Sequence, residues 1–95
     1  MPEIVVRYFG ILREITGKNQ EKISVNGSST VFELISEMAK RNGNKFKDFV
    51  FDSHGKPRKS LAFAINGDSV TYKRLKSRKC HEISEFVILP PISGG

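Results

Sequence analysis

The sequence predicts a single α+β domain, with a mixed sheet of four to five strands and one main helix packed on one face. Three observations predict it. The chain has 95 residues, which is enough for one hydrophobic core but not for two. Hydrophobic residues make up 38% of the chain, so a disordered chain is not expected. Segments with strand patterns lie before and after one long amphipathic segment, an order typical of α+β folds.

Two strands are predicted before the main helix. Residues 4–9 are apolar apart from Arg7, a pattern that suits a central strand covered on both faces. The next residues, 11–15, are too few for a stable helix and predict a turn or a single helical turn, closed by Gly17. Residues 21–25 alternate between polar and apolar side chains, which predicts a half-buried strand that forms a hairpin with the first.

The main helix has a clear beginning and end. Thr30 and Glu33 have the spacing of a capping box, in which each side chain accepts a hydrogen bond from the other residue's backbone N–H. Apolar residues then recur at helical spacing and form one face: Val31, Leu34, Ile35, Met38 and Ala39. The basic residues that follow, and then Gly43, are typical of a helix end.

The second half of the chain predicts further strands. Within residues 44–60, the helical spacing of Phe46, Phe49 and Val50 predicts a short second helix, whose aromatic rings are expected in the core, and residues 52–57 predict a turn. Residues 61–65 and 85–89 predict strands, and Asn66-Gly67 predicts a tight hairpin turn after the first of them. The economical sheet places the first and last strands side by side and parallel.

Composition limits the possible functions. Sixteen Lys and Arg against ten Asp and Glu give a net charge of +6, which suits a nucleic acid, a membrane surface or an acidic protein as partner. Cys80 is the single cysteine, so no internal disulfide forms, and no Cys/His cluster predicts a metal site. No leader is evident and no stretch approaches the roughly 20 apolar residues that span a bilayer, so we expect a cytoplasmic protein. With two His and no Trp, the reactive group is not expected to be a side chain.

The last residues form an unusual ending. Gly94-Gly95 closely follows Pro90-Pro91, and we expect a domain over residues 1–91 with a flexible tail over residues 92–95. A carboxylate that enters a narrow site needs neighbours without side chains, and prolines at the base of a tail reduce the entropy lost on docking. Such a tail presents its carboxylate for activation as an acyl-adenylate. On the glycines alone, a frayed end is the simpler interpretation.

Four stretches resemble, in chain order, the small subunit of molybdopterin synthase (MoaD), in the MoaD–ThiS family of ubiquitin-like sulfur carriers. They are Phe9-Gly10-Ile11-Leu12-Arg13-Glu14-Ile15-Thr16-Gly17, the helix start Thr30-Val31-x-x-Leu34-Ile35, the middle part Phe51-Asp52-x-x-Gly55-Lys56 with Leu61–Gly67, and the ending Phe86-Val87-Ile88-Leu89-Pro90-Pro91-Ile92-Ser93-Gly94-Gly95. The match runs over nearly the whole chain, and its ending is the most specific part. It implies the β-grasp, ubiquitin-like fold, which agrees with the predicted order of elements.

The resemblance implies a carrier that is not an enzyme on its own. A partner of the ubiquitin-activating type would use ATP to adenylate the carboxylate of Gly95, and sulfur transfer would convert it to a thiocarboxylate. Two such carriers would dock their tails into the large subunit of molybdopterin synthase and donate sulfur to a cyclic pyranopterin monophosphate. Gly94 would give access, and the residues that direct and anchor the tail would be Pro90, Pro91, Ile92 and Ser93. The carrier would bind no metal and no cofactor of its own.

Two features depart from the family pattern. The family has a Leu-x-Asp-Gly-Asp-Glu turn before the last strand, where this chain has residues 80–85; Cys80 then replaces a buried leucine, and His81, like His54, is expected in a loop. The second departure is a run of five cations: Lys73, Arg74, Lys76, Arg78 and Lys79. A solvated loop is the first interpretation of this run and a docking surface for an acidic partner is the second. RNA binding is the third, because only Tyr72 offers a ring for base stacking.

Other functions stay open on the sequence. The same ending occurs in ubiquitin-like protein modifiers, which would join to lysines of target proteins, and in carriers that supply sulfur for tRNA thiolation. A basic nucleic-acid-binding module with an inert tail is a further alternative, since the chain carries a net charge of +6.

Overall fold

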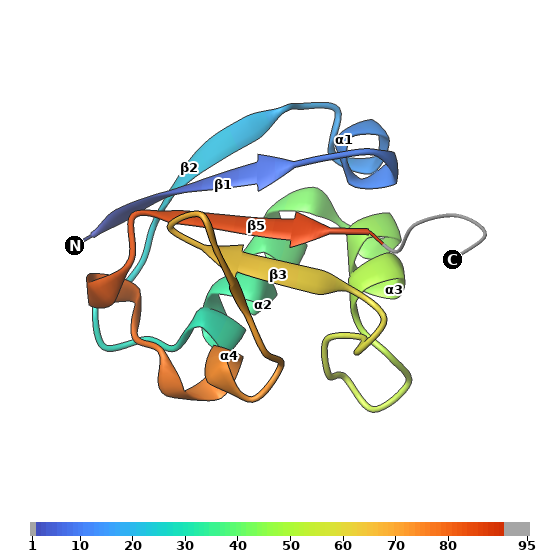
Figure 1. Cartoon of the computed structure of the whole chain (residues 1–95). Helices are drawn as coiled ribbons and strands as arrows, with labels where there is room; N and C mark the ends of the chain where they lie inside the picture. Colours follow the sequence, from blue (N-terminus) through green and yellow to red (C-terminus); the bar gives the residue numbers. More distant parts are fainter. Residues whose placement is uncertain (1, 91–95) are drawn as a thin grey trace.

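The computed structural model describes residues 2–90 and shows the predicted α+β architecture (Figure 1). In chain order, the elements are β1 (Glu3–Tyr8), α1 (Ile11–Thr16), β2 (Gln20–Ser24), α2 (Val31–Asn42), α3 (Asn44–Val50), β3 (Ala62–Ile65), β4 (Asp68–Val70), α4 (Arg74–Ser77), the 3₁₀ turn η1 (Cys80–Glu82) and β5 (Glu85–Leu89). The boundary predicted between residues 91 and 92 lies outside the described residues and stays a prediction.

One mixed sheet of five strands has the order β2-β1-β5-β3-β4. β5 is the central strand: it runs parallel to β1 and antiparallel to β3. The first and last strands are therefore adjacent and parallel, as predicted. The β3–β4 hairpin turns at Asn66 and Gly67, which have φ angles of 51° and 87°. A type I′ turn requires positive φ at both of these positions, so the predicted tight turn is confirmed.

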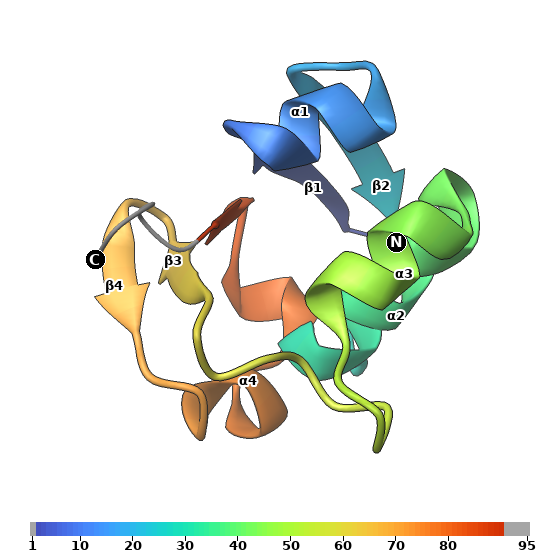
Figure 2. The same ribbon diagram turned by 90° about the vertical axis from the view of Figure 1, so that its right-hand side faces the viewer.

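The core lies between the sheet and the helices α2 and α3, which lie together on one side of the strands (Figure 2). α2 begins with the predicted capping box: Thr30 Oγ1 accepts from the Glu33 N–H at 3.2 Å, and Glu33 Oε1 accepts from the Thr30 N–H at 3.0 Å. The buried face of α2 consists of Val31, Leu34, Ile35 and Met38. The inner side of the sheet contributes Ile4, Val6, Tyr8, Phe63, Phe86 and Ile88.

β1 differs from the prediction in one respect. It is an interior strand between β2 and β5, but only one of its faces is covered. Ile4, Val6 and Tyr8 are buried, whereas Glu3 and Arg7 on the other face are exposed. The expectation of a strand covered on both faces is wrong, because α2 and α3 pack on the inner face alone.

The structure contains more helix than one main element. α3 is the predicted second helix, with Phe46 and Val50 buried, and α1 is the predicted helical turn. α4 lies inside the basic run, where the sequence predicts a solvated loop. That prediction is wrong for residues 74–77, because Leu75 is 0% exposed and anchors the segment to the core. Among residues 2–90, no helix is both long and apolar enough to cross a membrane.

Candidate functional site

The strand that leads to the C-terminal segment is held on both sides. β5 pairs with β1 along one edge and with β3 along the other, where Ala62 pairs with Leu89. Phe86 and Ile88 are 0% exposed and fix the strand to the core. The pairing and the buried side chains therefore hold Leu89 and Pro90, where the chain leaves the sheet, in a fixed position relative to the core. The remaining predicted residues of the ending lie outside the described residues: Pro91, Ile92, Ser93, Gly94 and Gly95.

The start of β5 does not use the Gly-containing turn of the family pattern. Asn66 Oδ1 instead accepts from the backbone N–H groups of Ser84 at 2.9 Å and Glu85 at 3.0 Å. At the start of η1, the Lys79 N–H donates to Glu82 Oε1 at 2.7 Å, and this hydrogen bond holds the pKa of Glu82 below its ordinary value. The replacement turn thus gives β5 a fixed beginning as well as a fixed end.

Cys80 has a structural role. It is 0% exposed, and its Sγ lies 3.6 Å from the Thr30 carbonyl oxygen. Burial raises the pKa of the thiol, so the reactive thiolate is disfavoured and the interpretation of Cys80 as core filler is confirmed. His54 and His81 are exposed; His54 lies in a turn, as predicted, whereas His81 lies in the 3₁₀ turn η1 and not in a loop. Within residues 2–90, no three His, Cys, Asp or Glu side chains gather into a possible metal site.

Pro90 lies against the turn that follows β1. Gly10 has a φ of +55°, and a Cβ atom at that position would come within 3.3 Å of Pro90 Cγ. A residue with a side chain would be strained there and would press on the proline. This close approach gives a physical basis for the predicted role of Pro90 in directing the tail.

An exposed apolar surface adjoins this exit, and no pattern in the sequence predicted it. Phe9, Ile11 and Leu89 are the exposed large hydrophobic residues of the described chain, with exposed fractions of 43%, 42% and 39%. Leu89 pairs with Ala62. Tyr8 pairs with Ile88 and Gly10 approaches Pro90, so Phe9, between Tyr8 and Gly10, falls next to Leu89 on the outer side of the sheet, and Ile11 follows two residues later. We call Phe9, Ile11, Ala62 and Leu89 the tail-base surface.

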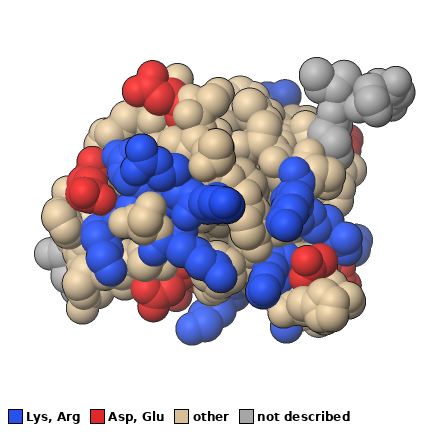
Figure 3. Space-filling model, turned by 60° about the horizontal axis from the view of Figure 1, so that its bottom comes forward, with Lys and Arg blue, Asp and Glu red and all other residues tan. Residues whose placement is uncertain are grey.

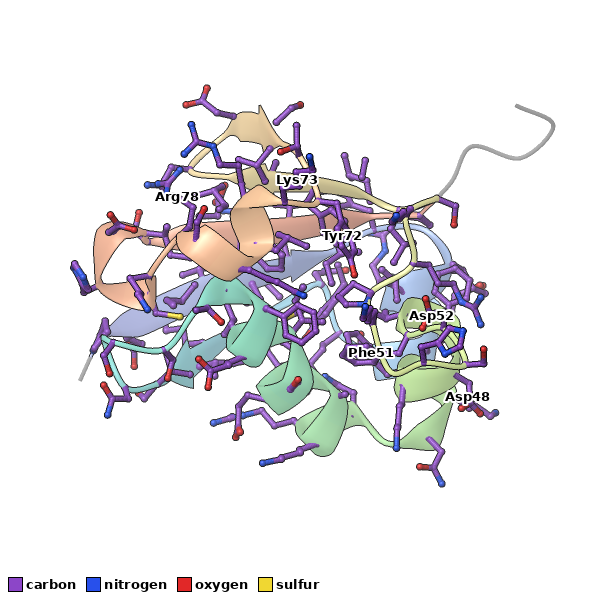
Figure 4. All side chains as sticks on the ribbon, turned by 90° about the horizontal axis from the view of Figure 1, so that it is seen from below. Asp48, Phe51, Asp52, Tyr72, Lys73 and Arg78 are labelled. Carbon is purple, nitrogen blue, oxygen red and sulfur yellow. The ribbon has the colours of Figure 1, made fainter. Side chains whose placement is uncertain are left out.

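The basic run lies elsewhere. α4 is at the lower left of Figure 1, whereas β5 ends at the right. Figure 4 places Lys73 and Arg78 beside α4. The structure therefore does not bring the two predicted sets of partner-binding residues together. The second set, away from Pro90, consists of Lys73, Arg74, Lys76, Arg78 and Lys79.

Comparison with solved structures supports the fold. The small archaeal modifier protein 1 (SAMP1) of Haloferax volcanii superposes with a TM-score of 0.85 and 22% identity, over 98% of this chain and 99% of that chain. SAMP1 of Methanosarcina acetivorans gives a TM-score of 0.81 and 25% identity, over 100% and 98%. A Pyrococcus furiosus protein assigned as molybdopterin converting factor subunit 1 gives 0.71 and 24%, over 97% and 100%.

The sequence itself matches a family, although no curated protein matches it significantly. The sequence model of the ThiS family matches residues 6–95, and the similar structures share the β-grasp fold that the resemblance implies. Carriers of this kind are small proteins without a catalytic centre of their own, and they work with activating enzymes and partner subunits. The chain therefore belongs to the ThiS family of ubiquitin-like sulfur carriers.

Proposed function

We propose that this protein carries sulfur as a thiocarboxylate on Gly95 and donates it in molybdopterin biosynthesis, as the small subunit of molybdopterin synthase. The observation that carries the proposal is the family match through residue 95, downstream of a central strand whose end is fixed beside an exposed apolar surface. The resemblance of residues 86–95 to the ending of that subunit favours the molybdopterin branch of the family.

In this proposal, no side chain of the carrier takes part in the chemical steps. On the activating enzyme, a carboxylate oxygen of Gly95 attacks the α-phosphorus of ATP and pyrophosphate leaves. Sulfide then attacks the acyl carbon, AMP leaves, and a thiocarboxylate remains. Gly94 and Gly95 have no side chains to obstruct a narrow site. The carrier contributes the chain end and the surface by which the partner holds it.

The tail-base surface is the docking surface in this proposal. Aromatic and aliphatic side chains at the centre of an interface supply much of its binding energy. Burial of the remaining exposed area of Phe9, Ile11 and Leu89 is worth on the order of 1 kcal/mol for each side chain. A partner that binds here holds the domain next to Pro90, where the chain leaves the sheet.

Intact-mass measurement tests the carrier role. The protein is incubated with its activating enzyme, ATP and sulfide, and we expect the mass gain of one oxygen replaced by sulfur, which deletion of Gly95 abolishes. Phe9→Ser should slow the conversion, whereas Lys22→Ser, which changes an exposed residue of edge strand β2, should not. Absence of any adenylate or mass gain with an active enzyme would refute the carrier role.

A second assay tests the pathway. The thiocarboxylated protein should convert a cyclic pyranopterin monophosphate to molybdopterin when the large synthase subunit is added. The alternative is a protein modifier, which the likeness to two SAMP1 structures favours, with TM-scores of 0.85 and 0.81. Higher-mass conjugates in cells that disappear with deletion of Gly95, together with no molybdopterin formation, would decide for the modifier. Sulfur transfer to tRNA through a thiolating enzyme would decide for the remaining alternative.

A further inference from the structure

A second surface of the molecule carries a concentration of positive charge that the carrier chemistry does not use. We call it the basic face: Lys56, Arg58, Lys59, Lys73, Arg74, Lys76, Arg78 and Lys79. Figure 3 views the molecule from this side and shows Lys and Arg spread over much of it. The Lys59 ammonium lies 5.6 Å from the centre of the Tyr72 ring, so the two segments that supply these cations are neighbours.

The cations of the second segment stand on a rigid frame. The segment after α4 makes backbone hydrogen bonds to the loop before α2: Val31 N–H donates to the Arg78 carbonyl at 3.0 Å, and Cys80 N–H donates to the Ser29 carbonyl at 2.8 Å. Leu75, in the middle of α4, is 0% exposed. A partner that binds here therefore meets an ordered surface, and less conformational entropy is lost than with a free loop.

The positive charge of the basic face is only partly compensated. Within residues 2–90, Arg78 is its one member that forms an ion pair, with Glu82 at 3.6 Å. The other ion pairs of the described chain lie outside the face, and Lys76 sits 5.5 Å from the centre of the Phe32 ring. Glu33 and Glu82 lie near Lys79, and Asp52 lies near Arg58. These three carboxylates are fewer than the eight cations of the face, so an anionic partner gains free energy by binding it.

The chemistry of the face favours a nucleic acid over a protein. Protein interfaces have an apolar core, but the exposed large hydrophobic residues of the described chain are Phe9, Ile11 and Leu89, at the tail base. The half-buried ring of Tyr72 lies between α4 and the segment that carries Phe51 (Figure 4). The ring packs against the core and has the Lys59 ammonium 5.6 Å from its centre, so an unpaired base would stack on it in place of Lys59.

We propose that the basic face binds folded RNA through its phosphate backbone, with an unpaired base taking the place of Lys59 over Tyr72, while the tail-base surface stays free for the activating enzyme or acceptor. RNA exposes unpaired bases in its loops. Duplex DNA is the weaker candidate, because its bases are read by an element that enters the major groove, and α4 has four residues. The proposal does not depend on sulfur chemistry at Gly95.

Fluorescence polarisation with a labelled RNA hairpin that has an unpaired loop tests the proposal on the full chain. Arg74→Gln with Lys76→Gln should weaken binding roughly tenfold at moderate salt, and should make the slope of log affinity against log salt shallower by about 1.5. The matched control, Arg13→Gln with Lys22→Gln, removes the same charge from α1 and β2 and should bind like the unchanged protein. Thermal unfolding of both variants verifies that they fold.

Further arms separate the possible anionic partners. Deletion of Gly94 and Gly95 should leave RNA binding unchanged, which keeps this test independent of the sulfur-carrier test. Equal weakening by the two double variants, or binding that does not respond to salt, would overturn the proposal. Equal or tighter binding of duplex DNA with the same number of phosphates would overturn the choice of RNA. Stronger competition by polyglutamate than by unlabelled RNA would identify the face as a docking surface for an acidic protein and would also overturn it.

Discussion

A hydrogen-bonded cluster ties the first hairpin to the end of α2, and its removal is the sharpest test of how the fold is held. The Tyr8 hydroxyl donates to the Glu21 carboxylate. Asn42 Nδ2 donates to the same carboxylate at 3.0 Å, and Lys18 Nζ lies 3.1 Å from its other oxygen. Tyr8 is 1% exposed and the Glu21 side chain 12%. The carboxylate therefore depends on these donors in place of water.

We predict that Tyr8→Phe lowers the free energy of unfolding by about 2 kcal/mol, because a hydrogen bond to a charged group is worth roughly 1.5–3 kcal/mol. The substitution keeps the ring, which packs edge-on against Phe46 with ring centres 6.1 Å apart. For a domain of this size, the loss lowers Tm by about 8–16 °C. Circular dichroism during thermal and urea unfolding measures both quantities.

The loss should depend on pH in a defined direction. Burial tends to raise the pKa of Glu21, but the hydrogen bonds from Tyr8, Asn42 and Lys18 outweigh it and hold the pKa below its ordinary value. A carboxyl with a lowered folded-state pKa stabilises the fold above its unfolded pKa of about 4.3, and this stabilisation is lost as the pH falls through the folded pKa. The difference between the unchanged protein and Tyr8→Phe should thus be constant near neutral pH and shrink in acid.

At high pH, ionisation of the Tyr8 hydroxyl also removes the stabilisation that this cluster provides. Burial, and then the Glu21 acceptor, raise the pKa of Tyr8 above its ordinary value. The resulting stabilisation is fully present below the unfolded tyrosine pKa of about 10 and is lost as the pH rises from there towards the folded pKa. Tyr72→Phe is the matched control, because the Tyr72 hydroxyl makes no hydrogen bond within residues 2–90. Equal losses in both variants, or a Tyr8→Phe loss that persists undiminished in acid, would refute the reasoning.

Three other changes probe the tail base, the main helix and the start of β5, and one reagent probes the core. Gly10→Ala should destabilise by about 1–3 kcal/mol in urea unfolding, because Gly10 has a φ of +55° and a Cβ would come 3.3 Å from Pro90 Cγ; an unchanged midpoint contradicts this. Thr30→Ala should cost about 1 kcal/mol through loss of the cap, and the serine variant should recover most of it. Asn66→Ala should cost about 2 kcal/mol and speed amide exchange at the start of β5, where two N–H groups lose their acceptor. Cys80 should react with thiol reagents only after unfolding, because it is buried and its pKa is raised; rapid labelling of the native protein would contradict this.

Local patterns account for much of the fold. Thr30 and Glu33 are three residues apart, and their hydrogen bonds need nothing beyond one helical turn, so the start of α2 is predictable. Asn66 and Gly67 supply the positive φ angles of a type I′ turn from their own chemistry. These are interactions between neighbours in sequence, and the structure agrees with each of them.

The failures concern contacts between distant segments. Arg7 sits in an apolar run that suggests a strand covered on both faces, but the number of layers around a sheet is set by where the helices pack. α4 is missed because Leu75 stands alone among cations, and its burial depends on the position of α2, against which α4 packs. The tail-base surface is missed for the same reason. The exposure of Phe9 follows from alternation after the buried Tyr8. Its place next to Leu89 follows only when the register of β1 with β5 is continued past Tyr8 and Ile88.

The parallel pairing of β1 and β5 explains why two motifs at opposite ends of the sequence form one site. Parallel strands end at the same edge of a sheet, so the residues after β1 flank the residues after β5. Tyr8 pairs with Ile88 and Gly10 approaches Pro90, so Phe9 falls between these contacts, next to Leu89. Under the proposed function, the partner supplies the reactive groups, and the carrier supplies a chain end beside a surface that positions it. This division of roles accounts for both the shortage of catalytic side chains in the sequence and the exposed apolar residues at the tail base.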